Sequence, residues 1–220
     1  MENKSLVEKK TKKGDFLEIK YIGYANGKVF DSNVEVELKK LNPEAQAKNL
    51  IICVGKSMII TGFDKALEGK EVGRDYSIEL NSEESFGERR RELVKTIPLS
   101  VFKEKNTQPQ PGMVLAFDNS IARIIAVSGA RVLTDFNNPL AGKKIKYEFK
   151  ILRIVEDEKD KISAILEFFI GFLPEFEIKD KIVVKMPKEL EKFVKSFSGK
   201  FKEFIGKELE FEEKIEEKKE

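Results

Sequence analysis

The sequence has no histidine, no tryptophan and a single cysteine among its 220 residues. Histidine is the commonest general base near neutral pH and a frequent metal ligand, so its absence excludes Ser-His-Asp and Cys-His catalysis and zinc sites with histidine ligands. Cys53 cannot form an internal disulfide, and because it lies in the apolar run 50–54 we expect a buried strand residue. We therefore predict neither a metal nor a cofactor.

The sequence also lacks a long apolar run and an excess of either charge. No segment is apolar enough to span a membrane, and the lysine-rich N-terminus has no apolar core of a signal peptide, which favours a cytoplasmic protein without membrane contact. The 41 basic and 39 acidic residues leave a net charge of +2, which argues against nucleic-acid binding. The abundance of lysine and glutamate is typical of heat-adapted proteins and predicts a thermophilic source.

Residues 21–32 are the most informative segment. They predict two strands joined by a tight turn at Asn26-Gly27, and the second strand ends with Phe30 followed at once by Asp31. Successive strand residues point to opposite faces, so we expect these two side chains on different sides of a sheet. An acid beside an apolar surface is costly without a partner, which makes Asp31 the first candidate for function.

The remaining pattern predicts an α+β protein. We expect strands at 16–24, 50–54 and 75–80 with a helix over 57–67, then an all-β block with strands at 93–97, 113–117, 121–127 and 131–136, and a long strand at 144–154. After these come a helix at 162–172, a hairpin over 176–186, an amphipathic helix over 188–206 that Ser198 and Gly199 could interrupt, and a short strand at 209–211.

Several motifs occur in the order found in one known family. They are Tyr21-x-Gly23, Gly27-x-x-Phe30-Asp31-Ser32, Val54-Gly55-Lys56, Ile59-Ile60-x-Gly62-Phe63-Asp64-x-Ala66-Leu67-x-Gly69, Val72-Gly73, Phe86-Gly87, Pro139-Leu140-Ala141-Gly142 and Tyr147-x-Phe149. Together they resemble the long, SlyD-like FKBP-type peptidyl-prolyl cis-trans isomerases, including archaeal ones, over residues 13–155.

The resemblance implies three domains. The isomerase domain would comprise residues 1–87 and 139–155 and have the FKBP fold, an antiparallel β-sheet wrapped around a short helix. Residues 88–138 would form an all-β insert-in-flap domain with chaperone activity. Residues 156–220 look like the extra C-terminal α/β domain of certain archaeal members. Its phenylalanine stripe is typical of a core but also compatible with a homodimer contact, and both alternatives stay open.

The activity implied is prolyl isomerisation that accelerates folding, combined with holdase activity on unfolded proteins that contain X-Pro bonds. The reaction breaks no covalent bond, so a chain without histidine can perform it. The alternative is a non-catalytic chaperone that keeps the fold without the chemistry. The histidine- and cysteine-rich metal-binding tail of many SlyD-like proteins is absent, so nickel binding is not implied.

The resemblance also implies the site residues. Phe63 would form the floor under the proline ring, the Ile60 N–H would hold a substrate carbonyl, and Asp31 would sit at the rim, within reach of the Tyr21 hydroxyl. The full set is Tyr21, Phe30, Asp31, Ile52, Ile59, Ile60, Phe63, Phe86 and Tyr147. Each has an ordinary alternative: core packing for Ile59, Phe63 and Tyr147, a buried tyrosine for Tyr21, and an Asx-turn for Asp31.

The sequence departs from the family at two of these positions, where many members carry tryptophan at Phe63 and tyrosine at Phe86. The missing hydroxyl at Phe86 removes a hydrogen bond worth about 0.5–1.5 kcal/mol. In the insert, apolar residues could bind an extended client or form the insert's own core, and the sequence does not separate the two. They are Ile97, Leu99, Val101, Phe102, Met113, Leu115 and Phe117.

Overall fold

The computed structural model describes residues 10–117 and 120–214. They divide into two compact units, one made of residues 10–80 with 145–214 and the other of residues 81–117 with 120–144. The predicted α+β class with antiparallel sheets and few helices is confirmed. None of the helices in the described ranges is long and apolar enough to cross a membrane.

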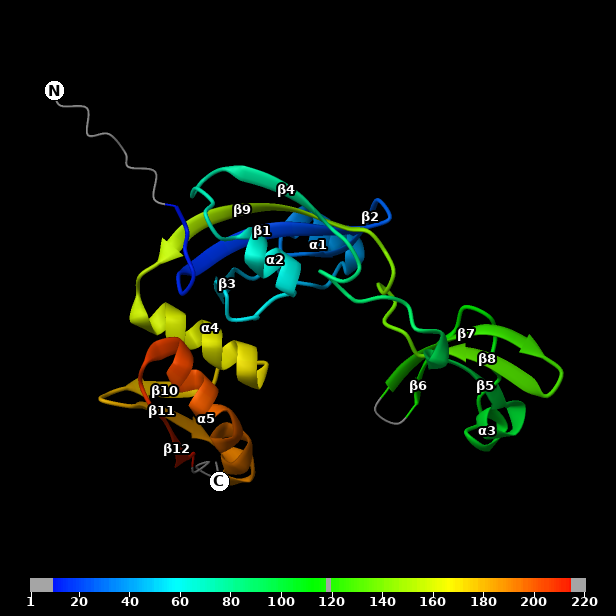
Figure 1. Ribbon diagram of the computed structural model, residues 1–220. Helices are drawn as coiled ribbons and strands as arrows, with labels where there is room; N and C mark the ends of the chain where they lie inside the picture. Colours follow the sequence, from blue (N-terminus) through cyan, green and yellow to red (C-terminus); the bar gives the residue numbers. More distant parts are fainter. Residues whose placement is uncertain (1–9, 118–119, 215–220) are drawn as a thin grey trace. The chain divides into compact units, whose positions relative to one another are not determined.

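The first unit is built on a five-stranded antiparallel sheet. Its order is β2-β1-β9-β4, and β3 pairs with the N-terminal half of β1. Helix α2 lies against one face of this sheet, and a short helix, α1, follows β2 (Figure 1). The elements are β1 (Phe16–Ala25), β2 (Lys28–Ser32), α1 (Glu35–Leu41), β3 (Leu50–Cys53), α2 (Thr61–Ala66), β4 (Asp75–Leu80) and β9 (Ile145–Val155).

The predicted turn between β1 and β2 is present. Asn26 and Gly27 have φ angles of 51° and 77°, the left-handed pair that a two-residue hairpin with right-handed strand twist requires. Alternate residues of β1 and β9, among them Leu17, Ile19 and Ile151, are fully buried. The alternation expected from the sequence therefore sets the core face of this sheet.

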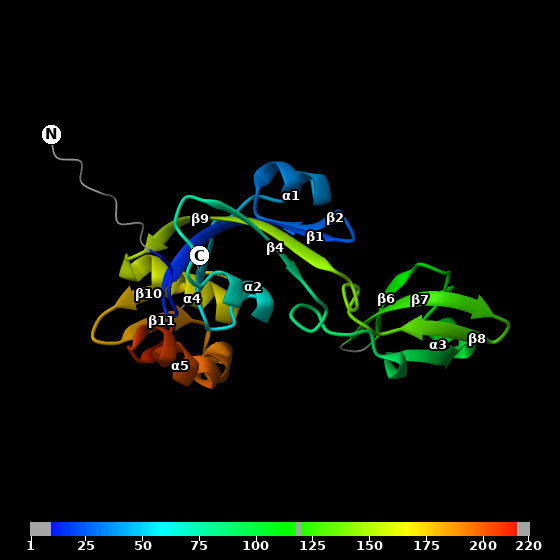
Figure 2. The ribbon, with the colours of Figure 1, turned by 45° about the horizontal axis from the view of Figure 1, so that its top comes forward.

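The C-terminal part of this unit places two helices beside a three-stranded sheet of order β10-β11-β12 (Figure 2). β10 and β11 form the predicted hairpin, while β12 pairs with β11 in parallel. One cluster joins Phe16, Cys53 and Val155 of the larger sheet to side chains of both helices. The elements are α4 (Glu158–Ile170), β10 (Glu175–Ile178), β11 (Ile182–Met186), a 3₁₀ turn (Lys188–Leu190), α5 (Glu191–Ile205) and β12 (Leu209–Glu213).

The ends of these two helices follow local rules. Asp157 caps α4 by accepting a hydrogen bond from the Asp160 N–H at 2.8 Å. Gly171 and Gly206 end α4 and α5 with φ angles of 89° and 79°. Helix α5 continues through Ser198 and Gly199, so the interruption considered there does not occur.

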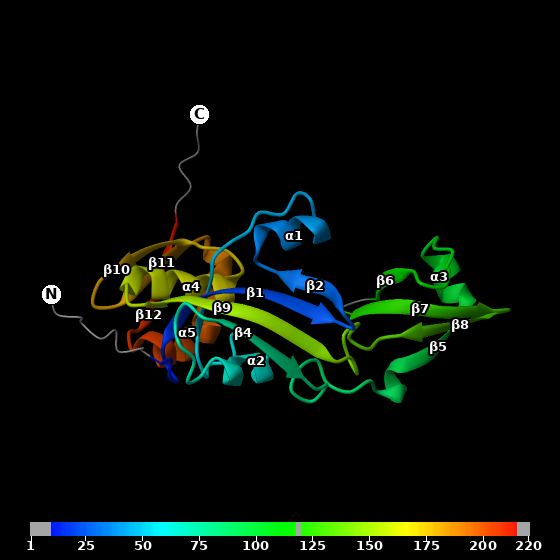
Figure 3. The same ribbon diagram turned by 90° about the horizontal axis from the view of Figure 1, so that it is seen from above.

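The second unit is a four-stranded antiparallel sheet of order β5-β8-β7-β6, with α3 following β5 (Figure 3). Phe102, Ile124 and Val132 are its buried centre. The elements are a 3₁₀ turn (Arg91–Leu93), β5 (Val94–Pro98), α3 (Leu99–Glu104), β6 (Val114–Phe117), β7 (Ser120–Ser128) and β8 (Arg131–Asp135).

The predicted helix over 57–67 is wrong in its first turn, because α2 begins only at Thr61. Ser57 has a φ angle of 56°, which a helix cannot accommodate, and the Asp64 carboxylate binds the N–H groups of Gly55 and Ser57. The apolar spacing of 59–67 indicated a helix, but these side-chain hydrogen bonds stabilise a turn instead. Helices α1 and α3 were not predicted.

Candidate functional site

An aromatic cluster lies between α2 and the sheet of the first unit. The rings of Phe63 on α2 and Tyr147 on β9 stack at 4.5 Å with an interplanar angle of 16°. Tyr21 packs at 6.0 Å from both rings, and Phe30 contacts Tyr147 at 6.0 Å. Phe63 and Tyr147 are only 2% and 4% exposed, whereas Tyr21 and Phe30 are half-buried. The cluster thus has a covered base and a solvent-facing rim.

A polar pair stands at this rim. The Tyr21 hydroxyl donates a hydrogen bond of 2.8 Å to Asp31 Oδ2, and the Asp31 side chain is exposed. Burial raises the pKa of the Tyr21 hydroxyl, and the hydrogen bond to Asp31 raises it further. Burial, helped by the charge of Asp31, also raises the pKa of Tyr147. Both hydroxyls therefore stay protonated across the physiological range, and the Tyr21 hydroxyl keeps its hydrogen bond to Asp31.

The expectation that Phe30 and Asp31 point to opposite faces is wrong. Gly23 pairs with Asp31 and Tyr24 pairs with Val29, so Phe30 is an extra residue in β2. Such a bulge interrupts the alternation of side chains. As a result the Phe30 ring contacts Tyr147 while the carboxylate of Asp31 meets Tyr21, which places both side chains on the aromatic cluster.

The segment that precedes α2 supplies a free donor. Asp64 is 4% exposed, and its two carboxylate oxygens accept hydrogen bonds from the N–H groups of Gly55 at 2.8 Å and Ser57 at 2.9 Å. Ile59 and Ile60 follow and are half-buried. Within the described residues the Ile60 N–H has no acceptor, although its carbonyl accepts from Asp64 N. The sequence analysis quoted Asp64 only as part of a motif and did not predict that it holds the preceding turn. An acid in the first turn of a helix, where it can bind nearby backbone N–H groups, could have indicated this role.

For two further predicted site residues the structure gives the burial of the side chain and the unit to which it belongs. Ile52 is buried in β3, with 1% of its surface exposed. Phe86 belongs to the second unit and is half-buried there. Their roles at the site stay predictions.

The structure sorts the apolar residues of the second unit. Phe102 is buried, and Ile97, Leu99, Met113, Leu115 and Phe117 pack against the same core, while Val101 is half-buried. The predicted client-binding set is therefore largely the core of this unit. Its exposed apolar residues are Val114 and Ile121, at 52% and 67%, with Ile125 and Val127 less exposed. Because successive strand residues face opposite sides, the sequence could have indicated that Val114 and Leu115 of β6 do not both face the core.

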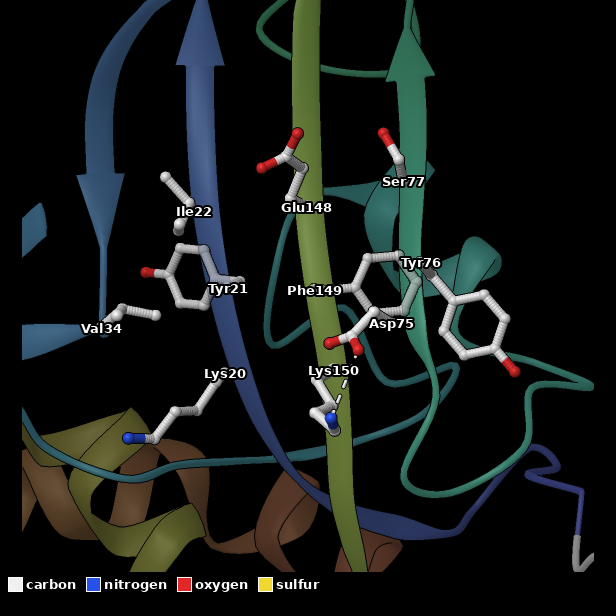
Figure 4. A pocket seen from close by; sticks show the side chains of 10 residues that line it. All are labelled: Lys20, Tyr21, Ile22, Val34, Asp75, Tyr76, Ser77, Glu148, Phe149 and Lys150. Carbon is white, nitrogen blue, oxygen red and sulfur yellow. Dashed lines mark hydrogen bonds and ion pairs between the residues drawn. The ribbon is translucent and has the colours of Figure 1, made fainter.

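A pocket of about 600 Å³ lies along β1, β9 and β4 (Figure 4). Its charged lining residues occupy the strand positions that alternate with those of Tyr21 and Phe149, so they face away from the aromatic cluster. Lys150 and Asp75 form an ion pair of 3.3 Å across it. In the described part of the chain no three histidine, cysteine or acidic side chains group as metal ligands would. The lining residues are Lys20, Tyr21, Ile22, Val34, Asp75, Tyr76, Ser77, Glu148, Phe149 and Lys150.

Comparisons with known proteins show which proteins the chain is similar to. Residues 95–140 match the family described as "FKBP26, IF domain". The chain is 34% identical over 153 residues to a short-type peptidyl-prolyl cis-trans isomerase of Methanocaldococcus jannaschii, covering 68% of this chain and 97% of that protein. It is 28% and 27% identical over 113 residues to the FKBP-type peptidyl-prolyl cis-trans isomerases SlyD of Haemophilus influenzae and Escherichia coli. Those two alignments cover 50% of this chain and 59% and 57% of the SlyD proteins.

Proposed function

The chain belongs to the family of FKBP-type peptidyl-prolyl cis-trans isomerases and is an enzyme of that type, and on this premise we propose that the aromatic cluster is its isomerase site. We further propose that the second unit holds unfolded polypeptides. The observation that carries the first proposal is the combination of a solvent-facing aromatic rim with one donor that is free among the described residues, the Ile60 N–H, and a Tyr21 hydroxyl that is held in place because it donates to Asp31.

The chemistry needs no proton transfer. Rotation about an X-Pro bond must overcome a barrier of about 18–20 kcal/mol, which reflects lost amide resonance. A planar amide separates more charge than a twisted one, so an apolar surface that replaces water favours the twisted state. Phe30, Ile59 and the ring of Tyr21 would supply this surface, with Phe63 and Tyr147 supporting it from below.

The polar groups of the site would bind the twisted bond more strongly than the planar one. The Ile60 N–H would hold the carbonyl on one side of the twisting bond, and Tyr21 would present a hydroxyl fixed by Asp31. Interactions accelerate the reaction only when they are stronger in the twisted geometry than in the planar one. Asp31 thereby acts on electrostatics and position, because the reaction transfers no proton.

A proline-limited refolding assay tests the site. Catalytic amounts of the protein should accelerate the slow phase, and Asp31→Ala and Phe63→Ala should weaken that acceleration. If both variants accelerate refolding as much as the wild-type protein does, the site assignment is contradicted. The competing function, a chaperone without isomerase activity, predicts suppression of aggregation that survives both substitutions.

The holdase proposal rests on the exposed apolar residues of β6 and β7. Monomeric proteins rarely leave neighbouring apolar side chains uncovered without a binding role, and Val114 and Ile121 lie on adjacent paired strands. Replacing both by serine should reduce protection of an aggregating protein while activity on a short proline peptide is unchanged. Val36→Ser, at a position 65% exposed on α1, is the matched control.

Deletion of residues 88–138 with a short loop in their place gives an independent test. Activity on short peptides should remain largely intact, while activity on unfolded proteins should fall sharply. Equal losses on both substrates would argue against a separate client-binding unit.

A homodimer through the C-terminal segment stays a prediction. Phe197 and Phe201 of α5 are buried in the protein's own core, so most of the phenylalanine stripe is accounted for within the chain. Phe172 and Phe193 remain partly exposed and would be the contact residues. Sedimentation of a monomer at high protein concentration would remove this proposal.

A further inference from the structure

Strand β3 has a free edge. Among the described strands it pairs only with β1. The Val54 N–H bonds to Asp15 on the β1 side, whereas the Cys53 N–H points the other way and donates to the Met58 sulfur at 3.2 Å. Because hydrogen-bonding directions alternate along a strand, the N–H and C=O of Ile51 also point away from β1. They have no partner in the described part of the chain.

Helix α4 forms the opposite wall of a groove along this edge. Asp160, Ser163, Ala164, Glu167 and Phe168 recur at helical spacing and make one stripe, while Ile162, Ile165 and Leu166 turn into the core. The small side chains at 163 and 164 leave a groove of about 250 Å³. Its other wall consists of Asn49, Leu50, Ile51, Ile52 and Met58.

The groove is apolar with acidic groups on one wall. Asp160 is paired with Arg153 at 2.9 Å, but the Glu167 carboxylate has neither a hydrogen bond nor an ion pair with any described residue. Phe168 is 43% exposed, and Phe172 and Leu173 extend the apolar surface beyond the end of α4. A segment with apolar side chains and one cation complements this surface in shape and charge.

The groove also reaches the segment that carries Ile60, whose N–H is the free donor of the proposed isomerase site. Met58 lines the groove and precedes Ile60 by two residues, so their Cα atoms are separated by at most about 7.6 Å. Resting on the isomerase function, we propose that the β3–α4 groove binds an extended, apolar and basic segment of the client polypeptide as an added strand on β3. Main-chain hydrogen bonds from a strand edge tolerate many sequences, which suits a catalyst of unfolded chains.

The test uses the full chain and a labelled, proline-free peptide of alternating valine and lysine, which lacks the isomerase substrate. Fluorescence anisotropy should show binding to the wild type and roughly tenfold weaker binding to Glu167→Lys, because a favourable charge contact becomes repulsive. Glu203→Lys on α5 changes the net charge equally and should bind as the wild type does. A valine–glutamate peptide should prefer the Glu167→Lys variant.

Two more measurements examine the geometry. Ala164→Phe fills the groove and should abolish binding, and N-methylation of alternate peptide bonds should do the same because the added strand loses its donors. Binding that is insensitive to Glu167→Lys and to N-methylation would overturn the proposal. The proposal would also be overturned if the wild-type protein is a dimer and Glu167→Lys makes it a monomer, because the groove would then bind a second copy of the chain.

The isomerase activity separates this proposal from the function on which it rests. Glu167→Lys should retain wild-type activity on a short proline peptide. Loss of peptide binding without loss of activity supports the groove. A wild-type protein that binds the peptide but does not isomerise would refute the site assignment alone.

Discussion

The ring of Phe30 lies so close to Gly23 that a Cβ on Gly23 would come within 2.9 Å of Phe30 Cζ. The same Cβ would come within 2.9 Å of Tyr147 Cε1. Glycine at position 23 therefore allows two aromatic rings to pack directly against the backbone of β1. The bulge at Phe30 and the absence of a side chain at 23 together bring the two rings into contact.

Gly23→Ala should disrupt the aromatic cluster. Both rings would have to move, at a cost of about 1–3 kcal/mol in the free energy of unfolding. We expect kcat/KM for a proline peptide to fall as well, because the moved rings form the proposed substrate surface. Denaturant unfolding and a peptide isomerisation assay measure the two effects. Gly199→Ala on α5, where a Cβ meets open space, should instead raise stability by about 1 kcal/mol.

Tyr21→Phe should lower activity more than stability. The substitution removes the hydroxyl that donates to Asp31, and a lost hydrogen bond to a polar group of this kind corresponds to about 0.5–1.5 kcal/mol of transition-state stabilisation. Tyr24→Phe is the matched control, since Tyr24 is also on β1 and donates a similar hydrogen bond of 3.0 Å to Glu148 on β9. Equal kcat/KM for the two variants would contradict a role for Tyr21.

Stability should fall at alkaline pH. Burial raises the pKa of Tyr21 and of Tyr147, so these hydroxyls stay protonated in the folded chain when unfolded tyrosine ionises. Their contribution is fully present below the unfolded pKa of about 10 and is lost as pH rises above it. Urea unfolding across this range should show a decline that is smaller in Tyr147→Phe. If the free energy of unfolding falls with pH equally steeply in Tyr147→Phe and in the wild type, Tyr147 does not contribute to the alkaline loss of stability.

Asp64→Asn should loosen the segment that presents Ile60. An asparagine side chain offers one acceptor where the carboxylate offers two, so either Gly55 or Ser57 loses its partner. We expect a loss of about 1–3 kcal/mol in stability and a lower kcat/KM. Asp75→Asn, at an exposed ion pair, is the control and should leave activity unchanged. Faster hydrogen exchange confined to residues 55–60 would identify the cause.

Arg153→Ala should destabilise the chain through Glu18. Glu18 is buried, and Arg153 binds it at 2.6 Å while also binding Asp160 of α4 at 2.9 Å. Removing the guanidinium leaves a buried carboxylate without its charged partner, at a cost of about 1–3 kcal/mol. Glu18→Gln should remove most of that penalty in the double variant. Additive effects of the two substitutions would show that the pair is not coupled.

Several elements follow from local sequence. The strands of the first sheet, the Asn26-Gly27 turn and the amphipathic α5 were predicted from spacing and turn residues, and the structure contains them. Helix α1 was missed because none of its side chains is buried, so it leaves no apolar periodicity to detect. The first turn of the predicted 57–67 helix was wrong because the carboxylate of Asp64, further along the same segment, binds the N–H groups of Gly55 and Ser57 and determines the backbone there.

The sequence by itself excluded histidine-dependent chemistry and, through the order of its motifs, indicated the family to which the chain belongs. Only the tertiary structure decided that Phe30 and Asp31 share a face, since a bulge is defined by the register of two strands. It also decided which apolar residues of the second unit are core, because burial depends on the partner strands. The free edge of β3 likewise depends on which strands meet and which do not.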